Sequence, residues 1–162
     1  QSLEKLSPIL LSTGRRSFID SFSINASGLT AERYRMDVIS ENIANIDTTR
    51  TEDGTPYRRK LVTFEEKGKN GTFASALAKA KGDYIGGGVR VGKTYEDTET
   101  EMKMVYDPSH PDADENGYVT YPNVNVITEM TDLIDASRSY EANATAFSAS
   151  KSMAVKGLEM AQ

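Results

Sequence analysis

The feature that most constrains the fold is a seven-residue apolar repeat in the last third of the chain, residues 123–162. The main row consists of Val126, Leu133, Tyr140 and Phe147, continued by Ala154 and Ala161, and a second row holds Met130, Ala144 and Leu158. A period of seven places residues on one face of a helix with about 3.5 residues per turn. Because no proline follows Pro122, the pattern predicts one helix of roughly 35 residues, about 50 Å long.

A matching stripe occupies the N-terminal part of the chain. Its main row is Phe22, Leu29, Met36 and Ile43, and its second row is Phe18, Ile39 and Ile46, with Asn25 and Glu32 as polar interruptions. This pattern predicts an amphipathic helix from about Phe18 to Ile46. The two helices can pair within one monomer and form its core, or they can assemble between copies of the chain. The periodicity does not distinguish between these alternatives.

Composition excludes several classes of protein. Only 38% of the residues are apolar and tryptophan is absent, a lean composition for a compact globule that a long two-helix arm would explain. The net charge of −5 argues against a nucleic-acid partner, which requires a basic face. The absence of cysteine excludes disulfides, thiol catalysis and cysteine-bound metals. No apolar run approaches the roughly 20 residues of a transmembrane segment, and Ile9–Leu11 is too short for a secretory signal sequence.

Between the two helices the periodicity changes, which indicates a β-rich insertion over residues 50–122. Strands are expected at 57–64, 89–95, 102–106 and 118–121, and a short two-turn helix or an ordered loop at 73–81. At the start of the chain, Pro8 and Gly14 argue against a continuous helix, so residues 1–16 are expected to be an added leader or a flexible native tail. The predicted fold class is therefore α+β. Residues 17–49 and 123–162 form a discontinuous terminal-helix domain around the insertion.

One acidic segment resembles a metal site. Asp112, Asp114, Asn116 and Gly117 match the first half of a calcium-binding loop. Position twelve of such a loop is a bidentate glutamate, but here it is Asn123. Acidic runs of this kind also form turns without metal, because Asp and Asn accept hydrogen bonds from nearby backbone N–H groups. A small calcium-dependent binding module that uses Asp112–Asn116 is the alternative function.

The sequence contains no recognisable set of catalytic residues. A hydrolase would have to use His110, the only histidine, but no nucleophile elbow or oxyanion-hole glycine accompanies it. A turn residue hydrogen-bonded to its neighbours is the favoured interpretation of His110. We therefore expect no enzyme, no catalytic or metal-binding residue, no cofactor and no small-molecule substrate.

Three groups of motifs resemble one known family. The first runs from Ser27 to Thr49 and includes Arg35-Met-Asp-Val-Ile-Ser-Glu-Asn-Ile-Ala-Asn45. The second is Asp107-Pro-Ser-His-Pro-Asp-Ala-Asp114, followed by Gly117-Tyr-Val119 and Tyr121-Pro-Asn-Val-Asn125, and the third is Ala136-Ser-Arg-Ser-Tyr-Glu-Ala-Asn143. Together they resemble the bacterial flagellar rod and hook proteins, and among these the proximal rod proteins of the basal body. The resemblance covers roughly residues 18–162.

The resemblance implies a structural subunit of the flagellar basal-body rod, which links the membrane ring to the distal rod and hook. In that family the terminal helices pair antiparallel and line the inner tube, outside the cytoplasmic membrane. The implied partners are copies of the chain, other rod proteins and the flagellar type III export apparatus. The apolar residues expected at the assembly interface are Phe22, Leu29, Met36, Ile39, Ile43, Met130, Leu133, Tyr140, Phe147 and Leu158.

Overall fold

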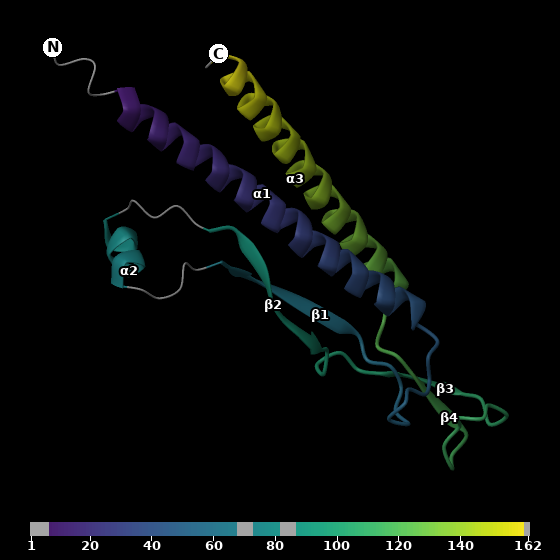
Figure 1. The fold of residues 1–162 in the computed structure, drawn as a ribbon. Coiled ribbons are helices and arrows are strands. Elements are labelled where there is room, and N and C mark those ends of the chain that lie inside the picture. The colour runs from purple at the N-terminus through teal and green to yellow at the C-terminus, as the bar shows by residue number, and fades with distance from the viewer. Residues whose placement is uncertain (1–6, 68–72, 82–86, 161–162) are drawn as a thin grey trace. The chain divides into compact units, whose positions relative to one another are not determined.

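The chain contains two long helices and two small sheets. The computed structural model describes residues 7–67, 73–81 and 87–160. In chain order the elements are α1 (Ser7–Ala44), β1 (Lys60–Glu66), α2 (Phe73–Ala80), β2 (Val89–Glu96), β3 (Lys103–Tyr106), β4 (Tyr118–Tyr121) and α3 (Val126–Met160), as labelled in Figure 1. The predicted α+β class is confirmed, and so are the four strands and the short helix. Ala161, the last residue of the predicted apolar row, lies outside the described residues.

Helix α1 begins earlier than the sequence pattern indicated. It starts at Ser7 and continues through Gly14 to Ala44, so the prediction that Pro8 and Gly14 prevent a continuous helix is wrong. Pro8 is the second helical residue, within the first turn, where a backbone N–H has no intrahelical partner and the fixed φ of proline suits a helix. A single glycine inside a helix costs only about 1 kcal/mol relative to alanine, which the rest of the helix offsets.

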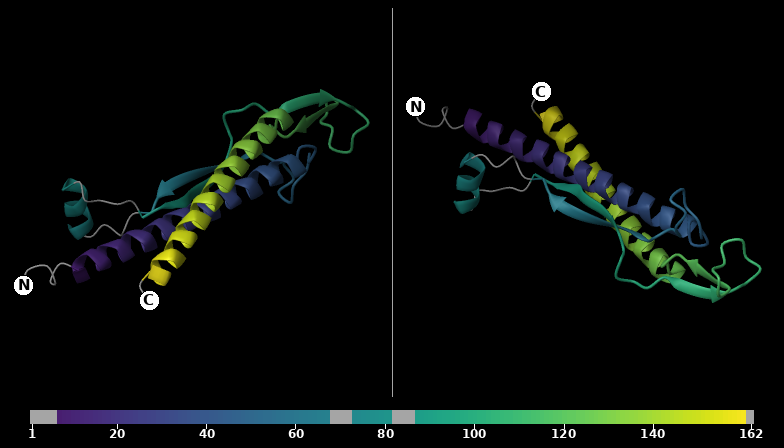
Figure 2. Two further views of the ribbon diagram at one scale, coloured as in Figure 1. Left: turned by 90° about the horizontal axis from the view of Figure 1, so that it is seen from above. Right: turned by 90° about the horizontal axis from the view of Figure 1, so that it is seen from below.

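The strands form two separate two-stranded sheets, one of β1 and β2 and one of β3 and β4. Strands β3 and β4 are antiparallel and lie side by side in both views of Figure 2, with Val105 opposite Val119 and Tyr106 opposite Tyr118. Because side chains alternate along a strand, Val105 and Val119 share one face and the two tyrosines share the other. Val119 is fully buried and Val105 is 39% exposed, so this face is covered on its β4 side.

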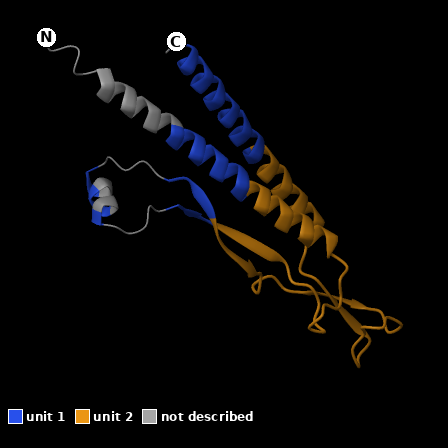
Figure 3. Ribbon diagram, in the orientation of Figure 1, with its two compact units in different colours: residues 1–31, 64–90, 139–162 blue, residues 32–63, 91–138 orange. Residues whose placement is uncertain are grey.

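The chain divides into two compact units, coloured in Figure 3, and each long helix contributes residues to both. Unit 1 comprises Gln1–Ala31, Phe64–Arg90 and Ser139–Gln162. In it the rings of Phe22 and Phe147 meet edge to face, with centroids 4.7 Å apart. A Cβ added at Gly28 would lie 2.8 Å from the Asn143 side chain. Gly28 on α1 has no side chain, so the Asn143 side chain of α3 can lie close to the α1 backbone.

The outer end of the β1–β2 sheet is fixed to α1 within unit 1. The Val89 N–H donates to the Ser27 hydroxyl at 3.0 Å, and that hydroxyl donates to the Ile24 carbonyl at 2.7 Å. Gly88 has a φ of 99°, and a Cβ there would collide with the Ser27 side chain. Glycine is therefore required at position 88 by both its backbone conformation and its close approach to α1.

Unit 2 comprises Glu32–Thr63 and Val91–Arg138 and holds most of the buried residues that the structure describes. Its buried apolar residues are Val38, Ile39, Tyr57, Val119 and Ala136, and its buried polar residues are Asn42, Asp97, Asn123 and Glu129. A core with nearly as many polar as apolar side chains needs hydrogen-bond partners for each of them. Unit 2 provides them in one connected network.

Among the described residues, no helix is both long and apolar enough to span a bilayer.

Candidate functional site

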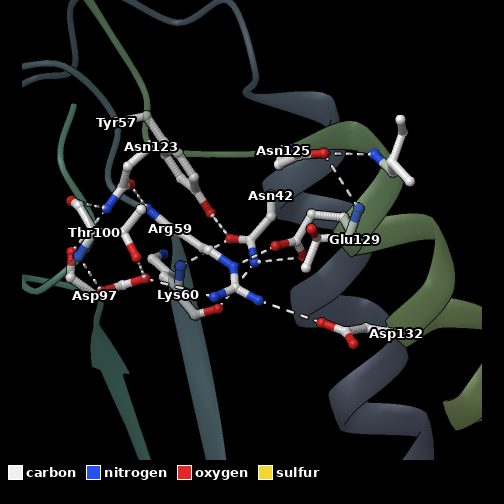
Figure 4. A network of polar contacts seen from close by, with 12 residues as sticks. Asn42, Tyr57, Arg59, Lys60, Asp97, Thr100, Asn123, Asn125, Glu129 and Asp132 are labelled. Atoms are coloured by element: carbon white, nitrogen blue, oxygen red, sulfur yellow. Dashed lines mark hydrogen bonds and ion pairs between the residues drawn. The ribbon is translucent and has the colours of Figure 1, made fainter. Parts of the chain in front are cut away.

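The most developed site in unit 2 is a network of polar side chains centred on Arg59, shown in Figure 4. Arg59 lies just before β1, and its guanidinium contacts three carboxylates from two other elements. Its Nε donates to Glu129 on α3, one terminal nitrogen lies 3.3 Å from Asp132 on the same helix, and the other lies 3.5 Å from Asp97 at the end of β2. The planar fork of an arginine suits this bridging role better than the single charge of a lysine.

Asn42, near the C-terminal end of α1, connects the N-terminal helix to this network. Its carbonyl oxygen accepts from the Tyr57 hydroxyl at 2.7 Å and from the Lys60 N–H at 2.9 Å. Its amide donates to the Lys60 carbonyl at 2.9 Å and to Glu129 at 3.2 Å. Asn42 and Glu129 are each only 1% exposed. All four contacts use a different donor or acceptor position, so the buried amide is fully satisfied.

Asn123 and Asp97 attach the β2–β3 connection to the same network. The Asn123 amide oxygen accepts from the Arg59 N–H at 2.8 Å, and its nitrogen donates to the carbonyls of Asp97 and Thr100. The Asp97 carboxylate accepts from the backbone N–H of Glu99 and from both the N–H and the hydroxyl of Thr100. A carboxylate with this many donors closes a tight turn and remains charged.

The start of α3 is fixed by a side-chain cap. The Asn125 side-chain oxygen accepts from the N–H groups of Ile127 and Thr128, at 2.9 and 3.3 Å. Asparagine is among the preferred residues at this position because it satisfies N–H groups that lack an intrahelical partner. Glu129 then lies in the first turn, where a negative charge interacts favourably with the helix dipole. The cap therefore fixes where α3 begins and which residue faces Arg59.

Burial and charge shift three ionisation equilibria in the network. Burial raises the pKa of the Tyr57 hydroxyl above its ordinary range, and the charges of Glu41, Glu129 and Glu96 raise it further. Burial alone would lower the pKa of Arg59, but its hydrogen bonds to Glu129 and Asp97 outweigh this effect and raise it. Hydrogen bonds from Thr100 hold the pKa of Asp97 below its usual value. Arg59 and Asp97 are therefore both charged at neutral pH.

The network is suited to holding elements together and not to chemistry. Each carboxylate that faces Arg59 is neutralised by it or by backbone donors, so none is available as a general base. Four segments far apart in sequence meet here: the end of α1, the residues around β1, the β2–β3 connection, and the start of α3. Neither Arg59 nor Glu129 was singled out from the sequence. The sequence around Asn42, Asn123 and Glu129 is mixed in polarity and gives no signal of the network.

The ten side chains predicted for the assembly interface have different degrees of exposure. Ile39 is buried, and Phe22, Leu29, Met36, Ile43, Leu133, Tyr140 and Phe147 are half-buried. Met130 and Leu158 are 53% and 65% exposed. The most deeply buried residues of α3 are Glu129 and Ala136, which are seven residues apart but in neither predicted row. The helical period was therefore predicted, whereas these two buried positions were not.

Glu32, a predicted interruption of the apolar stripe, has few contacts. Its carboxylate is 3.8 Å from Arg35 one turn along α1, and within the described residues its buried Oε2 has no hydrogen-bond partner. Burial raises the pKa of this carboxyl, and the nearby positive charge of Arg35 only partly opposes the shift. Glu32 is thus a half-buried carboxylate with incomplete hydrogen bonding, unlike the carboxylates that face Arg59.

The acidic segment that resembles half a calcium loop is a hydrogen-bonded turn. Asp112 accepts from the Thr49 hydroxyl at 2.7 Å and pairs with Arg50 at 2.9 Å. Asp114 accepts from the N–H groups of Asn116 and Tyr118. These protein donors engage both carboxylate oxygens of Asp112 and Oδ1 of Asp114. In the part of the chain that the structure describes, no three His, Asp or Glu side chains gather as a metal site.

His110 is the turn residue that its sequence context indicated. Its Nδ1 accepts from the Asp112 N–H at 3.0 Å, and its own N–H donates to the Asp107 carbonyl. The ring packs edge to face on Tyr121, with centroids 6.4 Å apart. This prediction is confirmed.

The family profiles and known proteins that match this chain all describe flagellar basal-body rod proteins. A family profile described as "Flagella basal body rod protein" matches residues 22–50, and "Flagellar basal body rod FlgEFG protein C-terminal" matches residues 115–160. The flagellar basal-body rod protein FlgC of Bacillus subtilis is 47% identical over 146 residues, which is 86% of this chain and 95% of the relative.

Two further relatives carry the same name. FlgC of Borreliella burgdorferi is 46% identical over 88% of this chain and 96% of its own length. FlgC of Escherichia coli O6:H1 is 38% identical over 90% of this chain and 99% of its own length. The matched profiles coincide with the two stretches of the chain that meet at Asn42 and Glu129. The chain therefore belongs to the FlgC family of flagellar basal-body rod proteins.

Proposed function

We propose how this chain, a structural subunit of the flagellar basal-body rod, carries load: α1 and α3 pair as an antiparallel coiled-coil arm. In unit 1, Phe22 contacts Phe147, and Gly28, further along α1, approaches Asn143, which is earlier on α3. In unit 2, Asn42 contacts Glu129. In unit 1 the partner's residue number falls as that on α1 rises, which supports an antiparallel arrangement of the two helices in that unit.

The arm would use the ten predicted side chains, Phe22, Leu29, Met36, Ile39, Ile43, Met130, Leu133, Tyr140, Phe147 and Leu158, to pack against copies of the chain and other rod proteins. Support comes from their incomplete burial, because most of them keep apolar surface that a neighbouring helix could cover. A helix seam with only half-buried large side chains gains further hydrophobic stabilisation from a second partner. In this proposal residues 17–49 and 123–162 form the rod core, and residues 50–122 form the β-rich insertion outside it.

The Arg59 network is the single observation that carries the proposal of torque transmission. It joins Asn42 of α1, Glu129 and Asp132 of α3, and Asp97 beyond β2 through charged and buried hydrogen bonds. Hydrogen-bonded ion pairs of this kind fix geometry, because breaking one leaves a buried charge without a partner. A force on the helices would thus reach the strands without a flexible link. The rod so built would connect the membrane ring to the distal rod and hook.

The proposal includes how the subunit reaches the rod. We infer export through the flagellar type III apparatus, followed by assembly outside the cytoplasmic membrane with other rod proteins. The family to which the chain belongs supports this route.

Truncation of Phe147 tests the arm. Phe147→Ala removes one ring of the Phe22–Phe147 pair, and such a pair contributes about 0.5–1.5 kcal/mol beyond its buried area. We expect a small loss of stability in the dilute monomer, with rod incorporation and motility abolished. The control is Met153→Ala on the same helix, where the side chain is 59% exposed. Normal motility of the Phe147→Ala strain would remove this part of α3 from the interface, and a severely destabilised monomer would place its role inside one chain.

A further inference from the structure

The outward face of the β3–β4 sheet is an exposed apolar surface, which we call the tyrosine face and define as Met104, Tyr106 and Tyr118. These side chains are 58%, 64% and 42% exposed. Val119, on the opposite face of the same sheet, is fully buried. Val105, opposite Val119 on that face, is 39% exposed, so only the β4 side of the face is covered. A sheet with one face toward the core normally presents polar residues to water on the other face. Tyrosine and methionine are instead typical of the centre of protein interfaces.

The tyrosine face is held rigid by the turn beside it. The rings of Tyr106 and Tyr118 meet edge to face, with centroids 5.3 Å apart. A Cβ at Gly117, whose φ is 83°, would lie 2.9 Å from the Tyr106 ring, so the ring rests against the glycine backbone. Asp114 caps the turn by accepting from two N–H groups. Rigid aromatic side chains lose little conformational entropy on binding.

Acidic residues surround this face in the sequence. Residues 96–116 contain eight acidic residues and a single lysine, Lys103. Among them Glu99, Glu101 and Glu115 are exposed. Lysine and arginine bind favourably both to carboxylates and to aromatic ring faces. The partner that complements this surface is therefore both apolar and basic.

Helix α2 has those two properties. Phe73 and Leu77, one helical turn apart, are 83% and 44% exposed and lie on the same side of the helix. The sequence from Lys67 to Lys81 contains four lysines and no acidic residue. Lys67 and Lys81, at the two ends of this segment, are exposed. An exposed phenylalanine between lysines is complementary to an acidic, tyrosine-lined surface.

We propose that α2 of one copy docks on the tyrosine face of a second copy in the assembled rod. The inference rests on the proposed function, in which copies assemble side by side. The two surfaces differ, so the contact is heterologous, and repetition of a heterologous contact generates rings or helices. Only two apolar side chains of α2 and three of the tyrosine face take part, whereas a stable interface uses roughly 20–30 residues a side. The contact is therefore weak between free monomers and forms in the rod, where neighbouring subunits are held at high effective concentration.

Disulfide cross-linking in assembled rods tests this contact, because the chain contains no cysteine of its own. Cells would produce two tagged versions of the full chain, one with Leu77→Cys and one with Met104→Cys, and purified basal bodies would be oxidised. The control replaces Met104→Cys by Asp53→Cys, on an exposed turn outside the tyrosine face. We expect on the order of tenfold more cross-linked dimer from the matched pair, because docking concentrates those two positions.

Three results would overturn the proposal: equal cross-linking in the two pairs, a cross-link only to a different rod protein, or a cross-link within one dilute chain that carries both cysteines. The amount of each version in the basal bodies is measured separately. Normal incorporation without the dimer rejects this contact alone, whereas absence of the unsubstituted chain from basal bodies rejects the proposed function.

Charge reversal gives a second measurement that does not depend on cysteine. Glu101→Lys with Glu115→Lys should reduce rod assembly, because the basic segment around α2 would then meet positive charge. Adding Lys67→Glu and Lys81→Glu to the same chain restores complementarity between neighbouring copies and should restore assembly. A quadruple variant that assembles no better than the double variant contradicts the pairing of these two surfaces.

Discussion

The two units hold the same pair of helices by different means. In unit 1 the described contacts between α1 and α3 are the edge-to-face rings of Phe22 and Phe147 and the close approach at Gly28. In unit 2, Asn42 on α1 and Glu129 on α3 are 1% exposed and belong to one hydrogen-bonded network around Arg59. One unit relies on shape and the other on charge and hydrogen bonds.

This difference determines how the stability of each unit should respond to a mutation that removes one contact. Apolar contacts between half-buried side chains add up in small steps, and the loss of one leaves the others in place. A buried ion pair fails abruptly, since removal of one partner leaves the other charged and desolvated. We therefore expect unit 2 to be the rigid part of each subunit and unit 1 to be the adjustable part. The four predictions below test that contrast.

The largest effect is expected at Arg59. Arg59→Met leaves Glu129 buried and unpaired, a change that typically costs about 3–5 kcal/mol, measured as the free energy of unfolding in urea. The control is Arg58→Met, which removes the neighbouring half-buried arginine and should cost much less. Arg59→Met combined with Glu129→Gln removes the unpaired charge and should recover part of the loss. Strictly additive losses in the double variant would mean that Arg59 and Glu129 are not coupled.

The contrast between the units also explains what the sequence could predict. Period seven in residues 22–43 and 126–147 and period two in the strands reveal elements, because they reflect local geometry. Polar networks leave no such period. Arg59 is separated from Glu129 by 70 positions, and Asn42 is separated from it by 87, so only the fold shows that they meet.

The start of α1 and the sites of closest packing were missed for other physical reasons. Proline inside a helix normally breaks it, but Pro8 lies within the first turn, where proline is tolerated, and the sequence alone does not show where that turn is. Gly28 reads as a weak point of a helix, although it gives room for Asn143. The same residue type can therefore break a helix or begin one, and weaken a helix or allow close packing. Only the three-dimensional structure shows which role it has.

A smaller effect is expected at Gly28 in unit 1. Alanine in place of a helical glycine normally stabilises by up to about 1 kcal/mol. At Gly157, where nothing lies within 4 Å of an added Cβ, Gly157→Ala should show this gain in helix content and melting temperature. Gly28→Ala should show less or a loss, because the Asn143 amide must move from its bond to the Ser139 carbonyl. Gly28→Ala combined with Asn143→Ala should recover the gain.

Equal stabilisation by the two single glycine variants would contradict close helix packing at position 28.

A smaller and pH-dependent effect is expected from Asp97. Hydrogen bonds from Thr100 lower the pKa of its carboxyl from 3.8 in the folded chain, so the folded state favours the ionised form. The stabilisation is present above the unfolded pKa and is lost as the pH falls through the folded pKa. The difference in free energy of unfolding between the unaltered chain and Asp97→Asn should shrink from about pH 5 to pH 2. Asp53→Asn, on an exposed turn, is the control, and a pH-independent difference at Asp97 would show that its charge is not involved.

The smallest effect is expected from calcium, which should cause no change. This experiment tests whether protein donors alone satisfy the carboxylates of the acidic turn in unit 2. Asp112 is engaged by Thr49 and Arg50, and Asp114 by the N–H groups of Asn116 and Tyr118. A ligand present at a hundred times its Kd would stabilise the folded chain by about 2.7 kcal/mol, a shift that calorimetry detects readily. We expect the melting temperature to be the same with calcium and with chelator, and the same lack of response in Asp112→Asn. A lower melting temperature in chelator for the unaltered chain, absent in Asp112→Asn, would make the turn a binding site. Unit 2 would then depend on an ion as well as on Arg59, because protein donors alone would not satisfy its carboxylates.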